Sequence, residues 1–305
     1  MRLYTHSACL EHDPGIGHPE SPARLRAVLQ ALDDPRFAAI ERVEAPRAIR
    51  EQLERVHGAE YVDYIFASSP SQGQLQLDPD TVMSPGSLEA ALRAAGAACA
   101  ATDAVLARET RRAFCAVRPP GHHATRNEAM GFCLFNSIAA AAAHALGAHR
   151  LERVAIVDFD VHHGNGTQAI FRHDPRVLYA SSHQMPLYPG TGEASEHGAG
   201  NIFNAPLPPG AGSIEFRAVW DKTLLPELDL FRPQLLLISA GFDAHARDPL
   251  AQLQLETDDY TWITQRLVEL ADRHADGRIV SSLEGGYDLE ALRECTAAHV
   301  AALIT

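Results

Sequence analysis

Short apolar runs recur along the chain and are separated by longer segments of helical composition. Five runs of strand length are apolar nearly throughout, at residues 113–117, 154–157, 177–180, 235–240 and 278–283. A continuous apolar run is typical of a parallel strand that is covered on both faces, whereas a half-exposed strand alternates. The pattern therefore predicts a buried, mostly parallel sheet.

The segments between these runs are predicted to be helices. Residues 87–107 and 136–149 are rich in alanine, the best helix former. Residues 253–274 also have a helical pattern, with Thr257 as the expected N-cap and two aspartates directly after it.

This alternation predicts an α/β fold with one open, mostly parallel sheet and helices on both faces. No repeat, linker or change of composition divides the chain, so residues 1–305 are expected to form a single domain. Residues 68–86 and 186–212 are rich in proline and glycine, and we expect them to be long surface loops.

The composition is that of an acidic globular protein. The 305 residues are 46% hydrophobic and carry a formal net charge of -13. This charge argues against nucleic acid or an anionic membrane surface as a partner, because both require basic patches. The N-terminus lacks the apolar segment of a signal peptide, and no stretch of about 18 apolar residues could span a bilayer. A cytoplasmic protein is expected.

The cysteines suggest no disulfide framework and no thiolate metal site. There are five of them, widely scattered and without a C-x-x-C pair, so we expect buried thiols. The chain also has 16 histidines, and only the clustered ones are given a functional interpretation.

Ionisable residues, glycine and proline follow each of the five predicted strands. The segments that follow the strands are, in chain order, "RPPGHH", "DFDVHHGNG", "SSHQMPLYPGTG", "GFDAHARDPL" and "EGGYDL". Open α/β sheets bind their ligands at the carboxyl ends of the strands. These segments are therefore expected to meet in one active-site crevice.

Two of these segments contain residues suited to a metal. Asp160 and His162 lie two apart, so on an extended backbone both side chains point the same way. The pair alone is weak evidence, but Asp243 after another strand can supply a third ligand. Two carboxylates and one imidazole, with no cysteine, describe a catalytic metal site with an open position.

A histidine pair and a tyrosine are the other candidates for catalysis. His122 and His123 have Asp158 and Asn165 available as hydrogen-bond acceptors. A carboxylate favours the charged imidazole more than a neutral amide does, so the two pKa values should be pushed apart. Tyr287 either donates to an oxyanion in the crevice or is a buried tyrosine whose hydroxyl finds a structural partner.

Together these segments resemble the histone deacetylase superfamily, and in particular its class II-like bacterial amidohydrolases. The matching motifs, in family order, are "RPPGHHA", "GFCLFN", "VDFDVHHGNGTQ", "YPGTG", "SAGFDAH" followed by "DPL", and "LEGGYDL". The segments "GHPESPARL" and "RVHGAEYV" extend the likeness to the N-terminal third. The resemblance implies the arginase/deacetylase fold.

The resemblance also implies a role for each matching residue. Zinc (Zn²⁺), with Fe²⁺ as an alternative, would be bound by Asp160, His162 and Asp243. His123 would be the general base and acid, His122 its electrostatic partner, and Tyr287 the donor to the tetrahedral oxyanion, while Asp158 and Asn165 would orient the two imidazoles. Many class I relatives have aspartate at the position of Asn165, so we predict that His123 is the less basic ring.

Further positions follow from the same resemblance. Potassium (K⁺) would bind near zinc through backbone carbonyls, Asp158 and Ser181. An acyl-lysine tunnel would pass between Phe132, which follows Gly131, and Tyr188. The rim contact to the substrate backbone would come from Asp78 or Asp80. His163 has no chemical role in this scheme, and we expect it to make a structural hydrogen bond.

The predicted function is removal of acetyl or other short acyl groups from acylated lysine side chains or similar amines, and the oligomeric state is left open. One alternative is an acetylpolyamine deacetylase, although Leu250 stands where the polyamine-specific relative has glutamate. A binuclear manganese hydrolase of the arginase type is a second, but Gly164 stands where it would need another aspartate. A non-catalytic acyl-group binding protein is the third.

Overall fold

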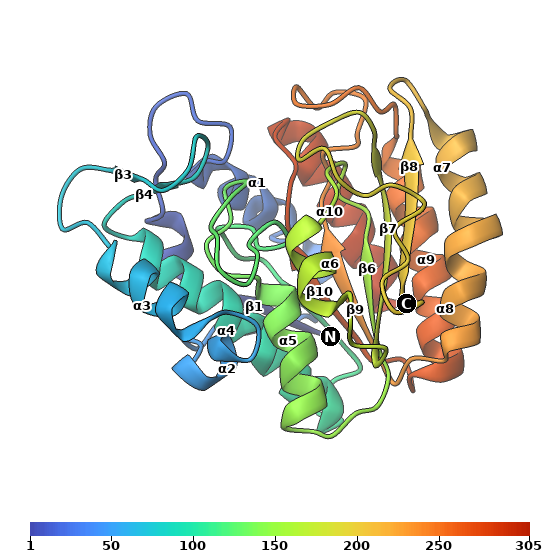
Figure 1. Ribbon diagram of the computed structural model, residues 1–305. Helices are drawn as coiled ribbons and strands as arrows, with labels where there is room; N and C mark the ends of the chain where they lie inside the picture. Colours follow the sequence, from blue (N-terminus) through green and yellow to red (C-terminus); the bar gives the residue numbers. More distant parts are fainter.

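Eight parallel strands form the central sheet of the computed structural model, which describes residues 1–305 (Figure 1). Their order across the sheet is β2-β1-β5-β10-β9-β6-β7-β8. The bounds are β1 Arg2–Thr5, β2 Glu41–Glu44, β5 Arg112–Cys115, β6 Val154–Asp158, β7 Val177–Gln184, β8 Ile202–Leu207, β9 Leu235–Ala240 and β10 Ile279–Leu283. Because all strands run the same way, the segments that follow them are gathered at one edge of the sheet.

The five strands predicted from apolar runs are the central ones. They are β5, β6, β7, β9 and β10, and every residue in them is buried. The predicted fold of one open parallel sheet covered on both faces is therefore confirmed. The predicted ends differ by a few residues, since β5 stops at Cys115 and β7 continues to Gln184.

Three strands of the sheet, β1, β2 and β8, were not predicted, and two of the expected loops contain strands. β2 is an edge strand with charged, mostly exposed residues, so it has no apolar run. β8, at the other edge, lies inside the segment 186–212 and includes asparagine and proline. The segment 68–86 contains an antiparallel pair, β3 Leu75–Gln76 and β4 Val82–Met83. The prediction of structureless loops was wrong at both places.

Helices cover both faces of the sheet (Figure 1). Their bounds are α1 Pro22–Ala31, α2 Arg50–Glu54, α3 Ala59–Ala67, α4 Ser87–Leu106, α5 Ser137–Gly147, α6 Asn165–Phe171, α7 Ser213–Val219, α8 Leu225–Phe231, α9 Thr257–His274 and α10 Leu289–Ile304. α4, α5 and α6 pack on one face, and α1, α7, α8, α9 and α10 pack on the other. No helix has both the length and the apolar character that crossing a membrane would require.

The predicted helices are present, with one correction at a terminus. α4 and α5 are lined by buried alanines, whose small side chains allow close packing, and Asn136 caps α5 by accepting from the Ala139 N–H at 3.0 Å. The N-cap of α9 is Glu256, because Thr257 is already helical; the Asp259 carboxylate accepts from the Glu256 N–H at 3.0 Å. All five cysteines are buried and unpaired, as expected.

Candidate active site

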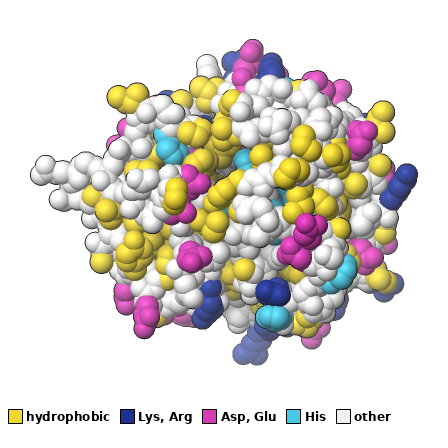
Figure 2. Space-filling model, turned by 45° about the horizontal axis from the view of Figure 1, so that its top comes forward, with side chains coloured by type: hydrophobic (Ala, Val, Ile, Leu, Met, Phe, Trp, Pro, Cys, Tyr) yellow, Lys and Arg dark blue, Asp and Glu magenta, His cyan; other side chains and the backbone are white.

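The segments that follow the central strands meet in a hollow at the carboxyl edge of the sheet. Figure 2 brings this edge toward the viewer and shows hydrophobic side chains gathered on it, with histidine and acidic side chains among them. His122, Asp160, His162, Asp243 and Tyr287 all lie just beyond strand ends here. The hollow is therefore the candidate active site.

The structure brings the three predicted metal ligands together. Asp160 and His162 follow β6, and Asp243 follows β9, the neighbour of β6 in the sheet. His162 Nδ1 is 3.1 Å from Asp160 Oδ1 and 3.1 Å from Asp243 Oδ2. One ligand atom from each of the three residues lies within 4.8 Å of the others, and all three side chains are buried. This is the arrangement that one small cation requires.

Backbone donors orient the two carboxylates toward His162. Asp160 accepts from the N–H of Gly285 at 2.8 Å and of His162 at 2.9 Å, and Asp243 accepts from the N–H of Val161 at 2.8 Å. A Cβ atom at Gly285 would overlap both carboxylates. Glycine is therefore required here for the chain after β10 to approach the ligands closely.

The electrostatics of this group favour a bound cation. Burial, together with repulsion from Asp160, raises the pKa of Asp243 to about 7. Burial alone would lower the pKa of His162, but the two carboxylates outweigh it and raise that pKa to about 10. Two carboxylates that share a buried site repel each other, and a divalent cation would relieve that repulsion.

The histidine pair lies beside these ligands, and each imidazole has the predicted acceptor. His122 Nδ1 is 3.0 Å from Asp158 Oδ2, and His123 Nδ1 is 2.8 Å from Asn165 Oδ1. The two ring centroids are 4.0 Å apart. Because the amide oxygen can only accept, a neutral His123 carries its proton on Nδ1. Its Nε2 is therefore free to accept a proton.

The pKa values of the two rings move in opposite directions, as the sequence predicts. Burial would lower the pKa of His122, but Asp158 and Asp160 outweigh it and raise the pKa to about 10. Burial and the charges of His122 and His162 hold the pKa of His123 well below its usual range. His122 is thus suited to remain charged, and His123 to exchange a proton.

Glu284 fixes the loop that carries the histidine pair, a role that sequence reasoning missed. Its carboxylate accepts from the N–H of Gly121 at 2.6 Å and of His122 at 3.2 Å, and from the Ser239 hydroxyl at 3.1 Å. Burial raises the pKa of Glu284 to about 7. The available signal was an acidic residue directly after the apolar run of β10.

Asn136 supports the same loop from the other side. Besides capping α5, its Nδ2 donates to the carbonyl oxygens of His122 at 3.4 Å and Ala124 at 3.2 Å. Sequence reasoning placed Asn136 at the start of a helix and gave it no role in the site. One side chain therefore fixes both the helix and the catalytic loop.

Tyr287 is held so that its ring faces the candidate tunnel. Its ring centroid is 5.9 Å from that of Phe132, and the Arg24 guanidinium lies 4.8 Å from it on the other side. Its backbone N–H donates to Asp248 at 2.7 Å, while its hydroxyl makes no hydrogen bond within the chain. Burial raises the pKa of Tyr287 well above its ordinary value, so the hydroxyl stays protonated as a donor. This favours the oxyanion interpretation over a purely structural tyrosine.

The predicted tunnel residues flank His123. Its ring lies 5.2 Å from that of Tyr188, centroid to centroid, in an edge-to-face arrangement. Gly131 and Phe132 have φ values of 57° and 68°, in the left-handed region, and a Cβ at Gly131 would overlap the His123 ring. Asp80 holds this turn by accepting from the Gly131 N–H at 3.0 Å. Glycine at position 131 is therefore required by both conformation and space.

The remaining predicted positions lie at the edges of the site. Asp78 accepts from the N–H of Asp80 at 2.8 Å. The Leu250 N–H donates at 3.0 Å to Asp248, the residue that also fixes Tyr287, so that loop is fastened to the tyrosine segment. Asp248 is the third supporting residue, after Glu284 and Asn136, that sequence reasoning missed.

The residues predicted for potassium are neighbours across two strands. Asp158 in β6 pairs in register with Ser181 in β7, and both are fully buried. His163 makes the structural hydrogen bonds expected of it, to Thr191 Oγ1 at 2.8 Å and Gln168 Oε1 at 2.9 Å.

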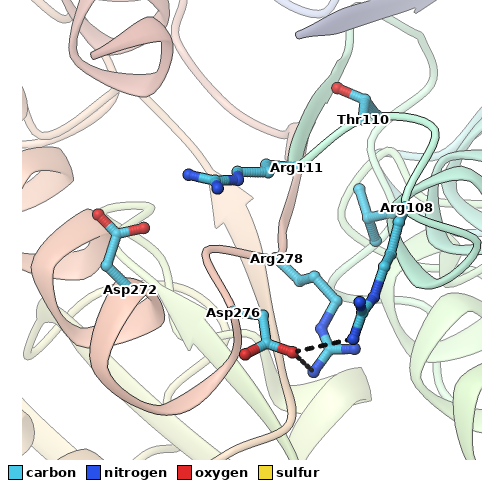
Figure 3. Close-up of a pocket in the computed structure, with 7 residues that line it drawn as sticks. Arg108, Thr110, Arg111, Asp272, Asp276 and Arg278 are labelled. Atoms are coloured by element: carbon cyan, nitrogen blue, oxygen red, sulfur yellow. Dashed lines mark ion pairs between the residues drawn. The ribbon is translucent and has the colours of Figure 1, made fainter.

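A cavity of about 550 Å³ lies at the opposite, amino edge of the sheet, next to the starts of β5 and β10 (Figure 3). None of the predicted catalytic residues lines it. Asp276 there is 3.3 Å from Arg278 and 3.8 Å from Arg108. Asp272 pairs instead with Arg112, at 3.1 Å, and the candidate catalytic residues lie at the carboxyl edge of the sheet.

Comparisons with known proteins agree with this assignment. Residues 18–303 match the family model of the histone deacetylase domain. The chain is 44% identical over 277 residues to a histone deacetylase-like amidohydrolase of Pseudomonas aeruginosa, covering 89% of this chain and 73% of that protein. It is 41% identical over 292 residues to a probable deacetylase of Archaeoglobus fulgidus, covering 93% and 80%.

A solved structure extends the likeness to the fold. The crystal structure of the HDA15 HD domain superposes with a TM-score of 0.94 at 35% sequence identity, covering 99% of this chain and 87% of that one. The similarity therefore includes the whole sheet and its helical layers.

Proposed function

The chain belongs to the histone deacetylase family and is a deacetylase-type enzyme acting on amides. We propose that it uses zinc to remove acetyl or other short acyl groups from acylated lysine side chains or similar amines. The observation that carries the proposal is the position of the Asp160, His162 and Asp243 group directly beside the histidine pair. Amide hydrolysis needs a nucleophile and a base next to each other, and here a water molecule at the metal site would lie beside His123.

Zinc fits the ligands that the chain offers. Two carboxylate oxygens and one imidazole nitrogen, with no thiolate, match a catalytic zinc site, although this set also accepts Fe²⁺. The paired buried carboxylates need a cation for charge balance. When bound, zinc would polarise the substrate carbonyl and lower the pKa of a water molecule.

The chain's own residues would then move the protons. His123 Nε2 accepts a proton from the attacking water and later delivers it to the leaving amine. His122 remains positively charged and stabilises the negative charge that develops in the transition state. The Tyr287 hydroxyl donates to the oxyanion. Asp158 and Asn165 hold the two imidazoles in the orientation that this sequence of transfers requires.

Substrate and potassium are proposed at the positions described above. The acyl chain would pass between Phe132 and Tyr188, and Asp78 or Asp80 would contact the substrate backbone at the rim. Potassium would bind near Asp158 and Ser181, two buried residues that are in register on neighbouring strands. Such a cation would also weaken the effect by which Asp158 raises the pKa of His122.

A turnover assay with metal-defined enzyme tests the proposal. Apoenzyme prepared with a chelator should be inactive, and one equivalent of zinc should restore hydrolysis of acetyl-lysine peptides. Asp243→Asn should lose both tight zinc and turnover, whereas Tyr287→Phe should retain zinc and lose about 10²–10³ in kcat. The panel includes longer acyl chains, acetylputrescine and acetylspermidine. Zinc-loaded enzyme that hydrolyses none of these amides, or apoenzyme that is fully active, would contradict the proposal.

A further inference from the structure

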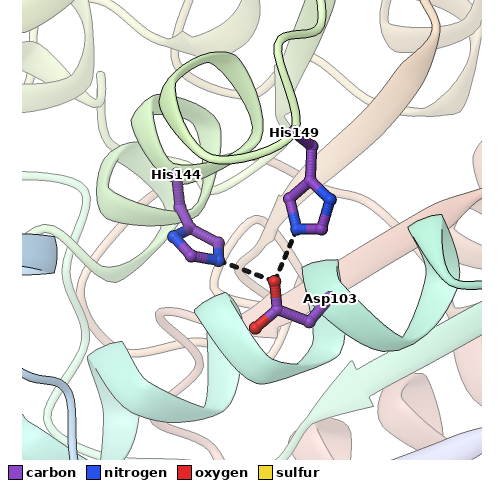
Figure 4. Close-up of side chains that lie close together, drawn as sticks. All are labelled: Asp103, His144 and His149. Atoms are coloured by element: carbon purple, nitrogen blue, oxygen red, sulfur yellow. Dashed lines mark hydrogen bonds and ion pairs between the residues drawn. The ribbon is translucent and has the colours of Figure 1, made fainter.

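A second group of metal-ligand residues lies outside the active site, and the proposed function gives it no role. It consists of Asp103 in the last turn of α4, His144 in the last turn of α5, and His149 in the turn after α5 (Figure 4). His144 Nε2 is 2.7 Å and His149 Nε2 is 2.6 Å from the same oxygen, Asp103 Oδ1. Three segments of the chain therefore point ligand atoms at one spot.

The group is accessible, in contrast to the buried catalytic ligands. The side chains of His144, His149 and Asp103 are 10%, 30% and 51% exposed. His149 begins the turn that leads into β6, so the group is at the amino edge of the sheet, opposite the catalytic hollow. An ion could enter here from solvent without passing through the active site.

We propose that Asp103, His144 and His149 form a second site for a divalent transition metal, with Zn²⁺ as the reference ion. Imidazole nitrogen suits zinc, nickel and copper, and a carboxylate oxygen supplies charge. Tetrahedral zinc holds its ligand atoms about 3.3 Å apart. Because the three ligand atoms already lie within 4.8 Å of one another, small side-chain rotations suffice, and water completes the coordination.

The hydrogen bond from Arg55 to His144 competes with metal binding. Its Nη1 is 2.6 Å from His144 Nδ1 and, as a guanidinium, can only donate. The His144 proton therefore sits on Nε2 and points at Asp103. Metal binding at Nε2 of the neutral imidazole requires that proton to move to Nδ1, where it would meet the Arg55 donor, so Arg55 must turn away. Arg55 already pairs with Glu51 at 2.8 Å, which gives it an alternative partner.

This competition predicts opposite effects for two kinds of substitution. His149→Gln and Asp103→Asn each remove a ligand and should abolish binding at this site. Arg55→Gln frees His144 Nδ1 to carry the ring proton, so it should tighten zinc binding by about tenfold. A bound ion would fasten α4 and α5 to the turn before β6 and should raise the Tm.

The experiment uses full-length enzyme already loaded with one equivalent of zinc in the catalytic site. Zinc is titrated by calorimetry, with bound metal per chain, Tm and turnover measured on the same samples. The wild type should take up a second equivalent with a rise in Tm. His149→Gln and Asp103→Asn should keep the first equivalent and turnover but lose the second and the rise in Tm.

Two results would overturn the site. One is that neither the wild type nor Arg55→Gln binds more than one equivalent of zinc. The other is a second equivalent that binds equally to the wild type, His149→Gln and Asp103→Asn, because the ion would then lie elsewhere. If no sample turned over substrate but the wild type still bound the second equivalent of zinc, the proposed function would be contradicted and the second metal site would be supported. The two proposals can therefore fail separately.

Discussion

His122 and His123 are neighbours in the chain, yet their surroundings give them different proton affinities. Burial and the charges of His122 and His162 lower the pKa of His123, whereas Asp158 and Asp160 outweigh burial and raise that of His122. The acceptors add to this difference, because Asp158 offers a charged oxygen and Asn165 a neutral one. Both rings are buried, so the charge of Asp158 is poorly screened and acts strongly on His122. A neutral side chain at position 165 therefore helps to keep His123 the less basic ring.

Replacing Asn165 with aspartate tests this contribution. The new carboxylate favours the charged imidazole, so we expect the pKa of His123 to rise. His123 must be neutral to act as base, so the acidic limb of kcat/KM against pH should move to higher pH. The measurement is kcat/KM between pH 5 and 9 with metal content held constant. An unchanged acidic limb would mean that His123 is not the base.

Removing each ring separately gives a second test at this scale. His123→Ala should lower kcat by about 10²–10⁴, the usual value of general acid–base catalysis, without loss of zinc. His122→Ala removes a charge and not the proton carrier, so its loss should be smaller. If His123→Ala kept most activity while His122→Ala lost it, the assignment of roles would be reversed.

At the scale of elements, the sequence predicts the strands that are buried and not those at the edges. β6 and β9 are continuous apolar runs because helices cover both of their faces. β2 is an exposed edge strand and β8 contains polar residues, so neither has that signature. The expected meeting of strand ends still located the site, because that argument needs only the central strands.

The supporting residues could not be predicted, because their roles depend on strand order. β10 lies between β5 and β9, and only this placement lets Glu284 reach both Gly121 and Ser239. The metal ligands could be predicted locally, from D-x-H spacing and strand ends, whereas the supporting contacts join residues 12 to 163 positions apart. A single sequence can mark a residue such as Glu284 as unusual, because it is acidic and directly follows an apolar run, but it does not identify its partners.

The double role of Asn136 leads to a prediction that separates helix stability from loop support. Asn136→Ala loses the cap of α5, worth about 1 kcal/mol, and also removes the donor of the Ala124 carbonyl and one of the two donors of the His122 carbonyl. Asn136→Ser keeps a capping oxygen but loses those donors, so it should recover part of the free energy of unfolding. Both variants should have reduced kcat/KM, because the loop loses the Asn136 donor to Ala124 and the His122 carbonyl is held by the Thr167 N–H alone, at 3.1 Å. Urea unfolding and steady-state kinetics measure the two effects; wild-type kcat/KM in Asn136→Ser would exclude the loop support.

At the scale of the whole molecule, several histidines outside the active site are buried in the neutral form. His299 lies between α9, α10 and β10, 2.7 Å from Thr264 Oγ1 and 2.8 Å from Ser281 Oγ. Burial lowers its pKa to about 3. Such a group makes the folded state less stable in acid, because the unfolded chain binds a proton at this histidine and the folded chain does not.

The sign and size of this effect follow from linkage. An unfolded histidine titrates near pH 6.5, so between about pH 6.5 and 3 the unfolded state binds one more proton at His299, and stability falls as pH falls. The slope is about 1.4 kcal/mol per pH unit. Glu284, with its pKa raised to about 7, contributes the opposite sign, so the slope of the wild type alone is not informative.

The difference between the wild type and His299→Asn isolates the contribution of His299. Asparagine keeps hydrogen-bonding capacity toward Thr264 but does not titrate, while Glu284 is common to both proteins. We expect the variant to be less stable at pH 7.5, where the histidine is neutral in both states and its packing counts fully. Between pH 6.5 and 5.5 its free energy of unfolding should fall by about 1 kcal/mol less than that of the wild type, because the unfolded histidine is already half protonated at pH 6.5. Urea unfolding at these three pH values measures the difference, and parallel pH profiles would mean that His299 binds a proton in the folded protein.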